Sequence, residues 1–218
     1  MPLEVDHAFV TCAPGAPEGD ALLKLGFVEG SGNTHPGQGT ANRRFFFENF
    51  MLELLWVTDQ REAQSERTRR TRLWERWAQR EQGVCPFGIV FRCADERPSS
   101  APFPVWSYMP AYLSGMSIEI AEGTTLQEPE LFFLSFLKGA SNRGPQPRVH
   151  AMPIRQISGL AVGVPDLAGL SAASIAAAER QLLRYFESRQ YVLEILFVGA
   201  PQMLDLRPGL PLLFRGIG

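Results

Sequence analysis

Two side chains in the sequence, Glu53 and His7, are of types that could do chemistry together. Glu53 lies in the middle of the apolar run NFMLELLWV at residues 49–57, which is otherwise typical of a buried strand. A charge in that setting is costly unless a cation, a metal or a set of hydrogen bonds pairs with it. His7 lies in a similar stretch, LEVDHAFVTC, and an imidazole with a carboxylate suits Zn, Mn, Ni, Co or Fe in an open site.

A metal site would need more donors, because two protein ligands bind a divalent ion only weakly. Glu194 and Glu119 lie in the strand-like runs VLEILFV and MSIEIAE and are the weaker ligand candidates. Further carboxylates and histidines that stay open as candidates are Asp205, Glu122, His35 and His150.

Each of the two main residues also has an ordinary structural interpretation. A histidine in a strand is by default a hydrogen-bonded residue of the core or of a cleft. Glu53 would be satisfied equally well by an ion pair with Arg43 or Arg44 across a hairpin. The residues alone leave these alternatives open.

The first 57 residues predict the order strand, helix, strand, strand, strand. In LEVDHAFVTC, simple alternation places Val5, His7 and Phe9 on one face and Asp6, Ala8 and Val10 on the other. The runs RRFFFEN and FMLELLWV are separated by Asn49 and Phe50, which indicates two antiparallel strands joined by a tight turn.

The rest of the chain predicts further units. Residues 59–82 are rich in charge and predict a surface helix whose Leu73, Trp74 and Trp77 dock on the sheet. Residues 85–137 contain short strand-like runs broken by Pro and Gly. The last 60 residues repeat the order of the first 57, with a strand at 157–164, a long helix capped by Ser171, and three more strands.

Three stretches together resemble a known family. VDHAFV, the loop THPGQGTANRRFF and the strand LELLWV are similar to the N-terminal module of glyoxalase-like proteins of the vicinal oxygen chelate superfamily. The resemblance implies an α+β fold in which paired βαβββ modules form a curved mixed sheet around a cleft, with an inserted middle β segment. The modules would be residues 1–57 and a degenerate 151–218, with a surface helix and the β segment at 58–150, all folded as one glyoxalase-like domain.

The resemblance also assigns roles to residues. His7 and Glu53 match the first-strand and fourth-strand positions that hold a divalent metal in the superfamily, and Glu53 is the expected catalytic residue. Asn42, Arg43 and Phe45 are the expected substrate-binding residues, because amide and guanidinium donors hold oxygens and an aromatic ring lines an apolar pocket.

Two functions follow as alternatives from the resemblance. One is a metal-dependent lyase, isomerase or dioxygenase that acts on a small oxygenated molecule. The other is a metal-free protein of the bleomycin-resistance type, which binds and sequesters a small molecule. No organic cofactor is indicated, and the resemblance allows a homodimer.

Composition limits the partners. The formal net charge is -2, so the whole chain has no attraction to nucleic acid or to an anionic membrane, and no apolar run is long enough for a membrane span. The arginines of residues 59–82 are expected on a solvated helix face rather than in a nucleic-acid site. Three widely spaced cysteines without a CxxC pair indicate free thiols and a cytoplasmic protein.

Overall fold

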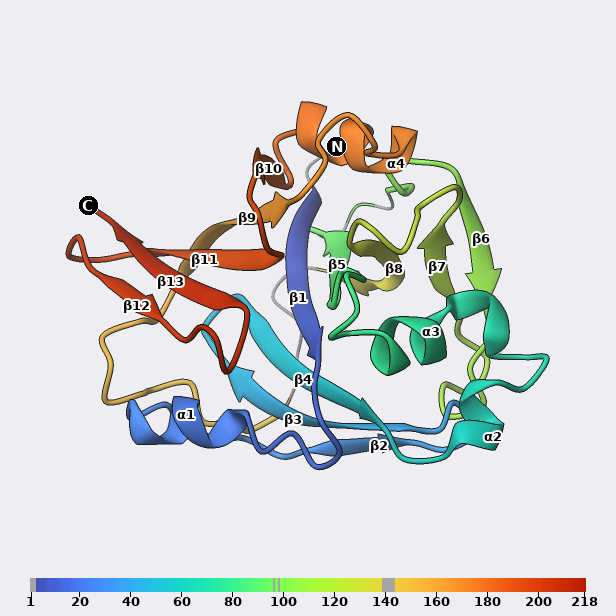
Figure 1. The fold of residues 1–218 in the computed structure, drawn as a ribbon, viewed down its shortest axis with the longest axis horizontal. Coiled ribbons are helices and arrows are strands. Elements are labelled where there is room, and N and C mark those ends of the chain that lie inside the picture. The colour runs from blue at the N-terminus through green and yellow to red at the C-terminus, as the bar shows by residue number, and fades with distance from the viewer. Residues whose placement is uncertain (1–2, 96, 98, 139–143) are drawn as a thin grey trace.

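The computed structural model describes residues 3–95, 97, 99–138 and 144–218 and contains two β-sheets (Figure 1). The larger sheet has eight strands in the order β2-β3-β4-β1-β5-β8-β7-β6. Its strands are β1 (Leu3–Thr11), β2 (Asn33–His35), β3 (Thr40–Phe46), β4 (Met51–Val57), β5 (Phe87–Cys93), β6 (Val105–Tyr108), β7 (Ile118–Ala121) and β8 (Glu130–Lys138). The predicted α+β fold with a curved mixed sheet is confirmed.

The smaller sheet has five strands in the order β10-β9-β11-β13-β12. Its strands are β9 (Ile157–Val164), β10 (Arg184–Glu187), β11 (Val192–Val198), β12 (Met203–Asp205) and β13 (Leu212–Ile217). The helices are α1 (Gly19–Lys24), α2 (Gln60–Ala63), α3 (Leu73–Ala78) and α4 (Ala172–Glu179), with a 3-10 turn at Arg69–Thr71. None of the helices in the described ranges is long and apolar enough to cross a membrane.

The two halves of the larger sheet have the same strand order. In the first half β1 runs parallel to β4, in the second β5 runs parallel to β8, and β1 meets β5 in antiparallel pairing at the middle. From the sequence we expected residues 151–218 to supply the second half, but the sheet partner of the first module is the middle segment, residues 87–138. The repeat is hard to see there because the described residues between β5 and β6 form no helix.

The C-terminal helix is shorter than expected. It ends at Glu179, and the positive φ of Gln181, 59°, turns the chain into the extra strand β10, so that Phe186 lies in a strand. The predicted cap is confirmed, because the Ser171 side chain accepts a hydrogen bond from the Ser174 amide.

The prediction of one continuous helix over residues 59–82 is wrong. The segment is divided into α2, the 3-10 turn and α3, and the break coincides with Arg72, which has a left-handed φ of 53°. The expected docking of its aromatic edge is observed in part: Trp77 Nε1 donates to the Cys12 carbonyl at 2.8 Å, and Leu73 is buried.

A β-bulge in β1 overturns the simple alternation expected for that strand. Val5 pairs with Phe91 and His7 with Val90, so that Asp6 is the extra residue of β1 at the bulge. Val5 therefore packs against the main core with Ala8 and Val10, whereas His7 lies on the other face.

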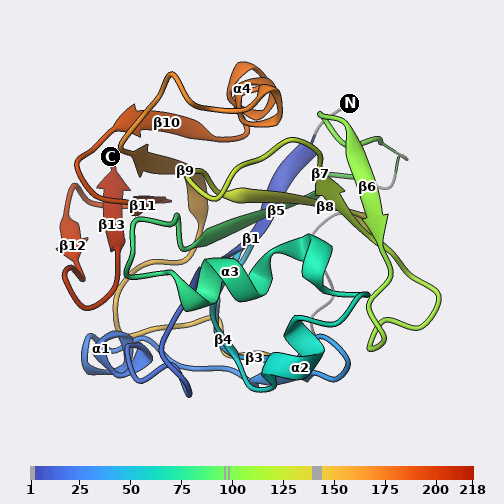
Figure 2. The same ribbon diagram turned by 45° about the vertical axis from the view of Figure 1, so that its right-hand side comes forward.

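The main hydrophobic core lies between the two sheets. It joins side chains such as Val10, Leu52 and Phe133 of the larger sheet to Val162, Leu193 and Phe214 of the smaller one. Figures 1 and 2 show the smaller sheet on one side of β1 and β5, with α2 and α3 on the other.

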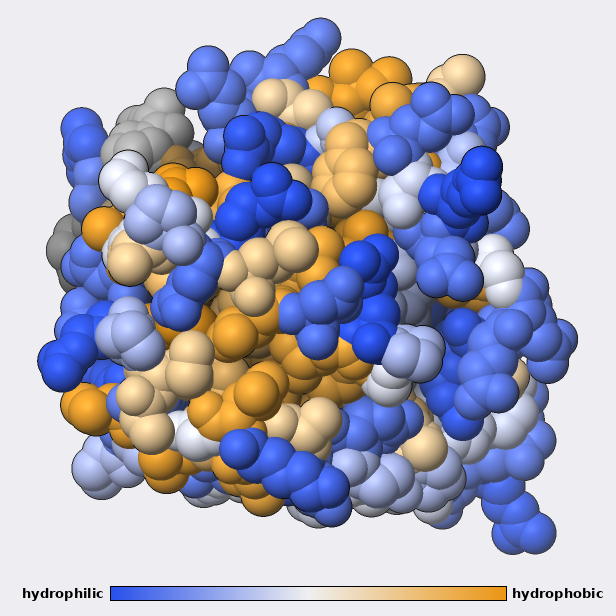
Figure 3. Space-filling view, turned by 60° about the vertical axis from the view of Figure 1, so that its left-hand side comes forward, coloured by the Kyte–Doolittle hydropathy of each residue, from blue (hydrophilic) through white to orange (hydrophobic). Residues whose placement is uncertain are grey.

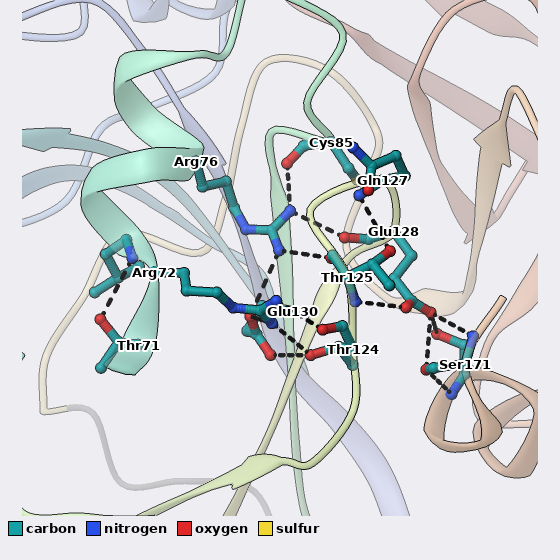
Figure 4. Close-up of polar contacts among 12 residues, drawn as sticks. Thr71, Arg72, Arg76, Cys85, Thr124, Thr125, Gln127, Glu128, Glu130 and Ser171 are labelled. Carbon is teal, nitrogen blue, oxygen red and sulfur yellow. Dashed lines mark hydrogen bonds and ion pairs between the residues drawn. The ribbon is translucent and has the colours of Figure 1, made fainter. Parts of the chain in front are cut away.

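A buried polar seam joins α3, β8 and the start of α4 (Figure 4). Glu130 accepts from Arg72 Nη2 at 2.7 Å and lies 3.5 Å from Arg76 Nη2. Glu128 accepts from the Ser171 hydroxyl at 2.9 Å and from the Ser174 hydroxyl at 2.6 Å. Because both carboxylates are 1% exposed, these contacts replace the water that each has lost.

Candidate functional site

A cavity of about 220 Å³ lies on the face of the larger sheet that is turned away from the main core. Its wall is built from both halves of the sheet, and α3, β6 and the loop after β6 contribute to its lining through Leu73, Tyr108 and Tyr112. Positions that alternate along β1 and β4 contribute His7, Glu53 and their neighbours, because alternate residues of a strand share a face.

The structure places His7 and Glu53 side by side in this cavity. Register pairs Glu53 of β4 with Phe9 of β1, two residues from His7, and the distance from His7 Nε2 to Glu53 Oε2 is 3.8 Å. Glu53 is 8% exposed and accepts a hydrogen bond from the Asn42 side chain, while Asn42 itself accepts from the Asn33 amide at 2.8 Å. The carboxylate is therefore satisfied by a neighbouring amide and faces the cavity beside an imidazole.

A second carboxylate, Asp6, lies behind the His7 ring. Its Oδ2 is 2.6 Å from His7 Nδ1, and its Oδ1 accepts from Arg92 Nη1 at 3.0 Å. Asp6 and Arg92 are 1% and 2% exposed. The contact fixes the orientation of the imidazole and leaves Nε2 directed at the cavity.

The turn between β2 and β3 covers the polar end of the cavity. His35 Nδ1 lies 2.8 Å from the Thr40 hydroxyl, and its ring packs on that of Tyr112 with the centroids 4.7 Å apart. Burial lowers the pKa of His35, and the negative charge of Glu53 partly offsets this effect. Burial also raises the pKa of Tyr112, whose hydroxyl lies 3.4 Å from Gln38 Oε1.

The opposite wall of the cavity, formed by β5 and β8, is apolar. Val90 comes from β5, and Phe132, Leu134 and Phe136 come from alternate positions of β8. The two halves of the sheet therefore have the same strand order but carry different chemistry, one polar and one apolar.

The three expected substrate-binding residues lie on different faces of β3. Asn42 lines the cavity, whereas Arg43 and Phe45 are outside its lining. Arg43 pairs with Glu29 at 2.6 Å and Asp20 at 2.9 Å, which raises its pKa. Phe45 is fully buried in the main core.

The weaker ligand candidates also lie away from the cavity lining. Glu194 is on β11 of the smaller sheet and pairs with Arg215 at 2.7 Å. Glu119 is on β7, where its neighbour Ile118 lines the cavity and burial raises the pKa of the Glu119 carboxyl.

The remaining candidates have structural partners. Glu122 lies 3.6 Å from Arg70, and Asp205 pairs with Arg207 at 2.7 Å. His150 accepts from the Val28 amide and contacts the Phe46 carbonyl, each at 3.0 Å. The ion pair considered between Glu53 and Arg43 gives way to the Asn42 contact, since Arg43 is engaged on the other face. Arg44, the other arginine considered, pairs in register with Glu53 and lines the cavity, and its Nε donates to the Ser31 carbonyl at 2.7 Å.

The donor set does not complete a metal site. His7 and Glu53 supply two protein donors, whereas catalytic zinc sites use three protein ligands and an open position. Within the part of the chain that the structure describes, no group of three or more His, Cys, Asp and Glu side chains is placed to hold a metal ion. The positions facing His7 and Glu53 across the cavity are filled by apolar residues.

Asp6, Gln38 and Tyr112 are site residues that reasoning from the sequence missed. Asp6 was placed on the opposite face because a bulge leaves no clear signal in the sequence of a strand. Gln38 was interpreted as part of a glycine-rich turn, although it lies between His35 of β2 and Asn42 of β3, which is a usable signal. Tyr112 comes from a distant loop, and only the fold brings it to His35.

Comparison with known proteins agrees with this architecture. Residues 5–173 match the model of a family described as "Glyoxalase-like domain". No curated protein matches the sequence, while 47 solved chains match by structure. One is a hypothetical protein from Staphylococcus aureus, with 10% identity, a TM-score of 0.54 and full coverage of both chains.

Another solved structure is a mutant of 4-hydroxymandelate synthase from Streptomyces coelicolor, with 14% identity and a TM-score of 0.46 over 99% of this chain and 62% of that one. At 10% identity the first of these matches shows the fold alone, and nothing is argued from the second. The family match is the stronger finding, because residues 5–173 include all of the eight-stranded sheet except the first two residues of β1. The chain therefore belongs to the glyoxalase-like family of the vicinal oxygen chelate superfamily.

Proposed function

We propose that the protein binds a small molecule with an apolar body and a polar head in the cavity of the eight-stranded sheet. The observation that supports this is the division of the cavity wall. Phe132, Leu134 and Phe136 would hold the apolar body, and His7 and Glu53 would hold the head. A mostly apolar pocket with a few convergent polar groups is the usual form of a small-molecule site.

This proposal needs no metal, in keeping with the two-donor set. A broad ligand screen by thermal shift, run with and without a chelator, tests it. Stabilisation by an aromatic or aliphatic compound that persists with chelator is the expected result. A broad library without a single stabilising compound would count against the proposal.

Two variants locate the binding. Glu53→Gln removes the carboxylate that faces the cavity and should weaken the stabilisation by a hit. Glu119→Gln is the matched control, because Glu119 is a partly buried carboxyl of the same sheet outside the cavity lining. Equal loss in both variants would show that the compound binds elsewhere.

A second candidate function is a metal-dependent lyase, isomerase or dioxygenase with Glu53 as the catalytic residue. One observation favours it: Asp6 lies behind His7, and metal-binding histidines usually give their other ring nitrogen to a carboxylate. Substrate oxygens or water would then have to supply the missing ligands. Metal analysis of protein purified without a nickel column, followed by addition of Zn, Mn, Ni, Co or Fe, distinguishes this candidate from the first.

A second copy of the chain is the proposed protein partner. Figure 3 shows a broad apolar area on one face of the molecule, and exposed apolar side chains of the smaller sheet include Val198, Met203 and Ile217. Light scattering at several concentrations tests this, and a monomer at every concentration would remove it. We also propose a cytoplasmic location, which the three buried free thiols support.

A further inference from the structure

Asp6 and His7 are neighbours in the chain, yet their side chains meet. In a regular strand, successive side chains point to opposite faces and cannot touch in this way. The bulge at Asp6 removes that restriction, because the register shifts between Val5 and His7. The result is a distance of 2.6 Å from Asp6 Oδ2 to His7 Nδ1.

The partners of Asp6 decide which atom carries the proton in this contact. Arg92, itself 2% exposed, donates to Asp6 Oδ1 at 3.0 Å and so holds Asp6 as a buried carboxylate. An ionised carboxylate can only accept hydrogen bonds. The facing nitrogen, His7 Nδ1, must therefore carry the hydrogen.

The other ring nitrogen faces an acceptor across a longer gap. His7 Nε2 is 3.8 Å from Glu53 Oε2, which is beyond hydrogen-bond length. A protonated Nε2 beside a carboxylate would be drawn to about 2.7–2.9 Å. The observed separation fits two acceptors that face the cavity without a proton between them.

We infer that Asp6 is a positioning residue that fixes the ring proton of His7 on Nδ1 and so leaves Nε2 as an open acceptor beside Glu53. The polar end of the cavity then presents two adjacent acceptors. As far as the ligand is concerned, the inference rests on the proposed function: the head of the bound molecule brings its own donors, as a hydroxyl or an ammonium group does.

Nitrogen NMR of the full chain labelled with 15N-histidine tests the tautomer without any ligand. The chain has three histidines, so His35→Gln and His150→Gln variants assign the signals. Recorded at a pH at which the imidazole is neutral, the His7 signals should show a protonated Nδ1 and an unprotonated Nε2. The reverse pattern in the unmodified protein would overturn the inference, whatever the variants do.

The variant Asp6→Asn asks whether Asp6 sets the tautomer. Arg92 still needs an acceptor, so the Asn carbonyl turns to Arg92 and the amide NH₂ turns to His7, which moves the ring proton from Nδ1 to Nε2. Glu4→Gln is the matched control, because Glu4 accepts from Arg92 Nε at 2.9 Å. This substitution neutralises another carboxylate that binds the same arginine and leaves the Asp6–His7 contact unchanged.

The expected outcome is a proton shift in Asp6→Asn and none in Glu4→Gln. An unchanged His7 pattern in Asp6→Asn, or the same shift in both variants, would refute the assignment. If Asp6→Asn does not fold, the spectrum of the unmodified protein alone decides. None of these readings depends on ligand binding, so a failed ligand screen would leave this test intact.

Discussion

Replacing Glu130 with Gln removes a buried negative charge that two arginines share. Arg76 has no exposed surface and lies 3.5 Å from Glu130, while Arg72 is partly exposed and bonds Glu130 at 2.7 Å. Loss of one partner of a buried ion pair leaves an uncompensated buried charge, which costs about 3–5 kcal/mol.

The contacts of each arginine place the expected cost at the lower end of that range. Arg76 still donates to the Glu128 carbonyl at 2.9 Å and to the Cys85 carbonyl, and Arg72 can turn to water. We therefore expect Glu130→Gln to lower the free energy of unfolding by about 3 kcal/mol. For a chain of this length that corresponds to a fall of roughly 6–12 °C in Tm.

Urea denaturation followed by fluorescence measures the change. Glu122→Gln is the matched control, because Glu122 and Arg70 lie 3.6 Å apart with side chains that are 52% and 62% exposed. That exposed pair should contribute only about 0–1 kcal/mol. If Glu130→Gln costs no more than Glu122→Gln, the account of the seam as a buried charge cluster is wrong.

Burial lowers the pKa of His150, so the unfolded chain takes up this proton first as the pH falls below about 6.5. His150 alone therefore lowers the stability with a slope of at most ~1.4 kcal/mol per pH unit. His150→Phe should flatten this slope, measured as unfolding free energy against pH, although it also loses the bond from the Val28 amide; an unchanged slope would contradict the prediction. Gly39 has a φ of 71°, and a Cβ there would lie 2.2 Å from the Asp59 carbonyl oxygen, whereas Gly115, at 74°, has no atom within 4 Å of such a Cβ. Gly115→Ala should cost about 1–2 kcal/mol and Gly39→Ala about 1–3 kcal/mol more; equal losses in thermal unfolding would refute the steric argument.

Much of the first half of the larger sheet could be predicted from the sequence. The hairpin of β3 and β4 follows from two apolar runs around Asn49 and Phe50, and the structure pairs these strands antiparallel, with Phe46 opposite Met51. The pairing of the halves was not predictable in the same way. Strands β5 to β8 are joined by irregular loops, and strand order depends on long-range pairing that local patterns do not record.

The predictability of the site follows the same physics. His7 and Glu53 could be singled out from the sequence because a polar group in an apolar strand is costly and therefore informative. Arg43 and Phe45 were misplaced relative to the cavity, because the face of a strand depends on register and on which sheet face is covered. For Asp6 the obstacle was the bulge, a one-residue insertion that reverses every side chain preceding it.

Glu128 has a consequence for how the chain can be shortened. Its carboxylate takes hydrogen bonds from Ser171 and Ser174, and Tyr185 in turn donates to Ser174 at 2.9 Å. The family match stops at residue 173, between these two serines. Ending the chain at that border would remove the Ser174 hydroxyl, one of the four donors to the Glu128 carboxylate, and would expose the packing between the sheets to solvent, so the natural unit for expression extends through β13.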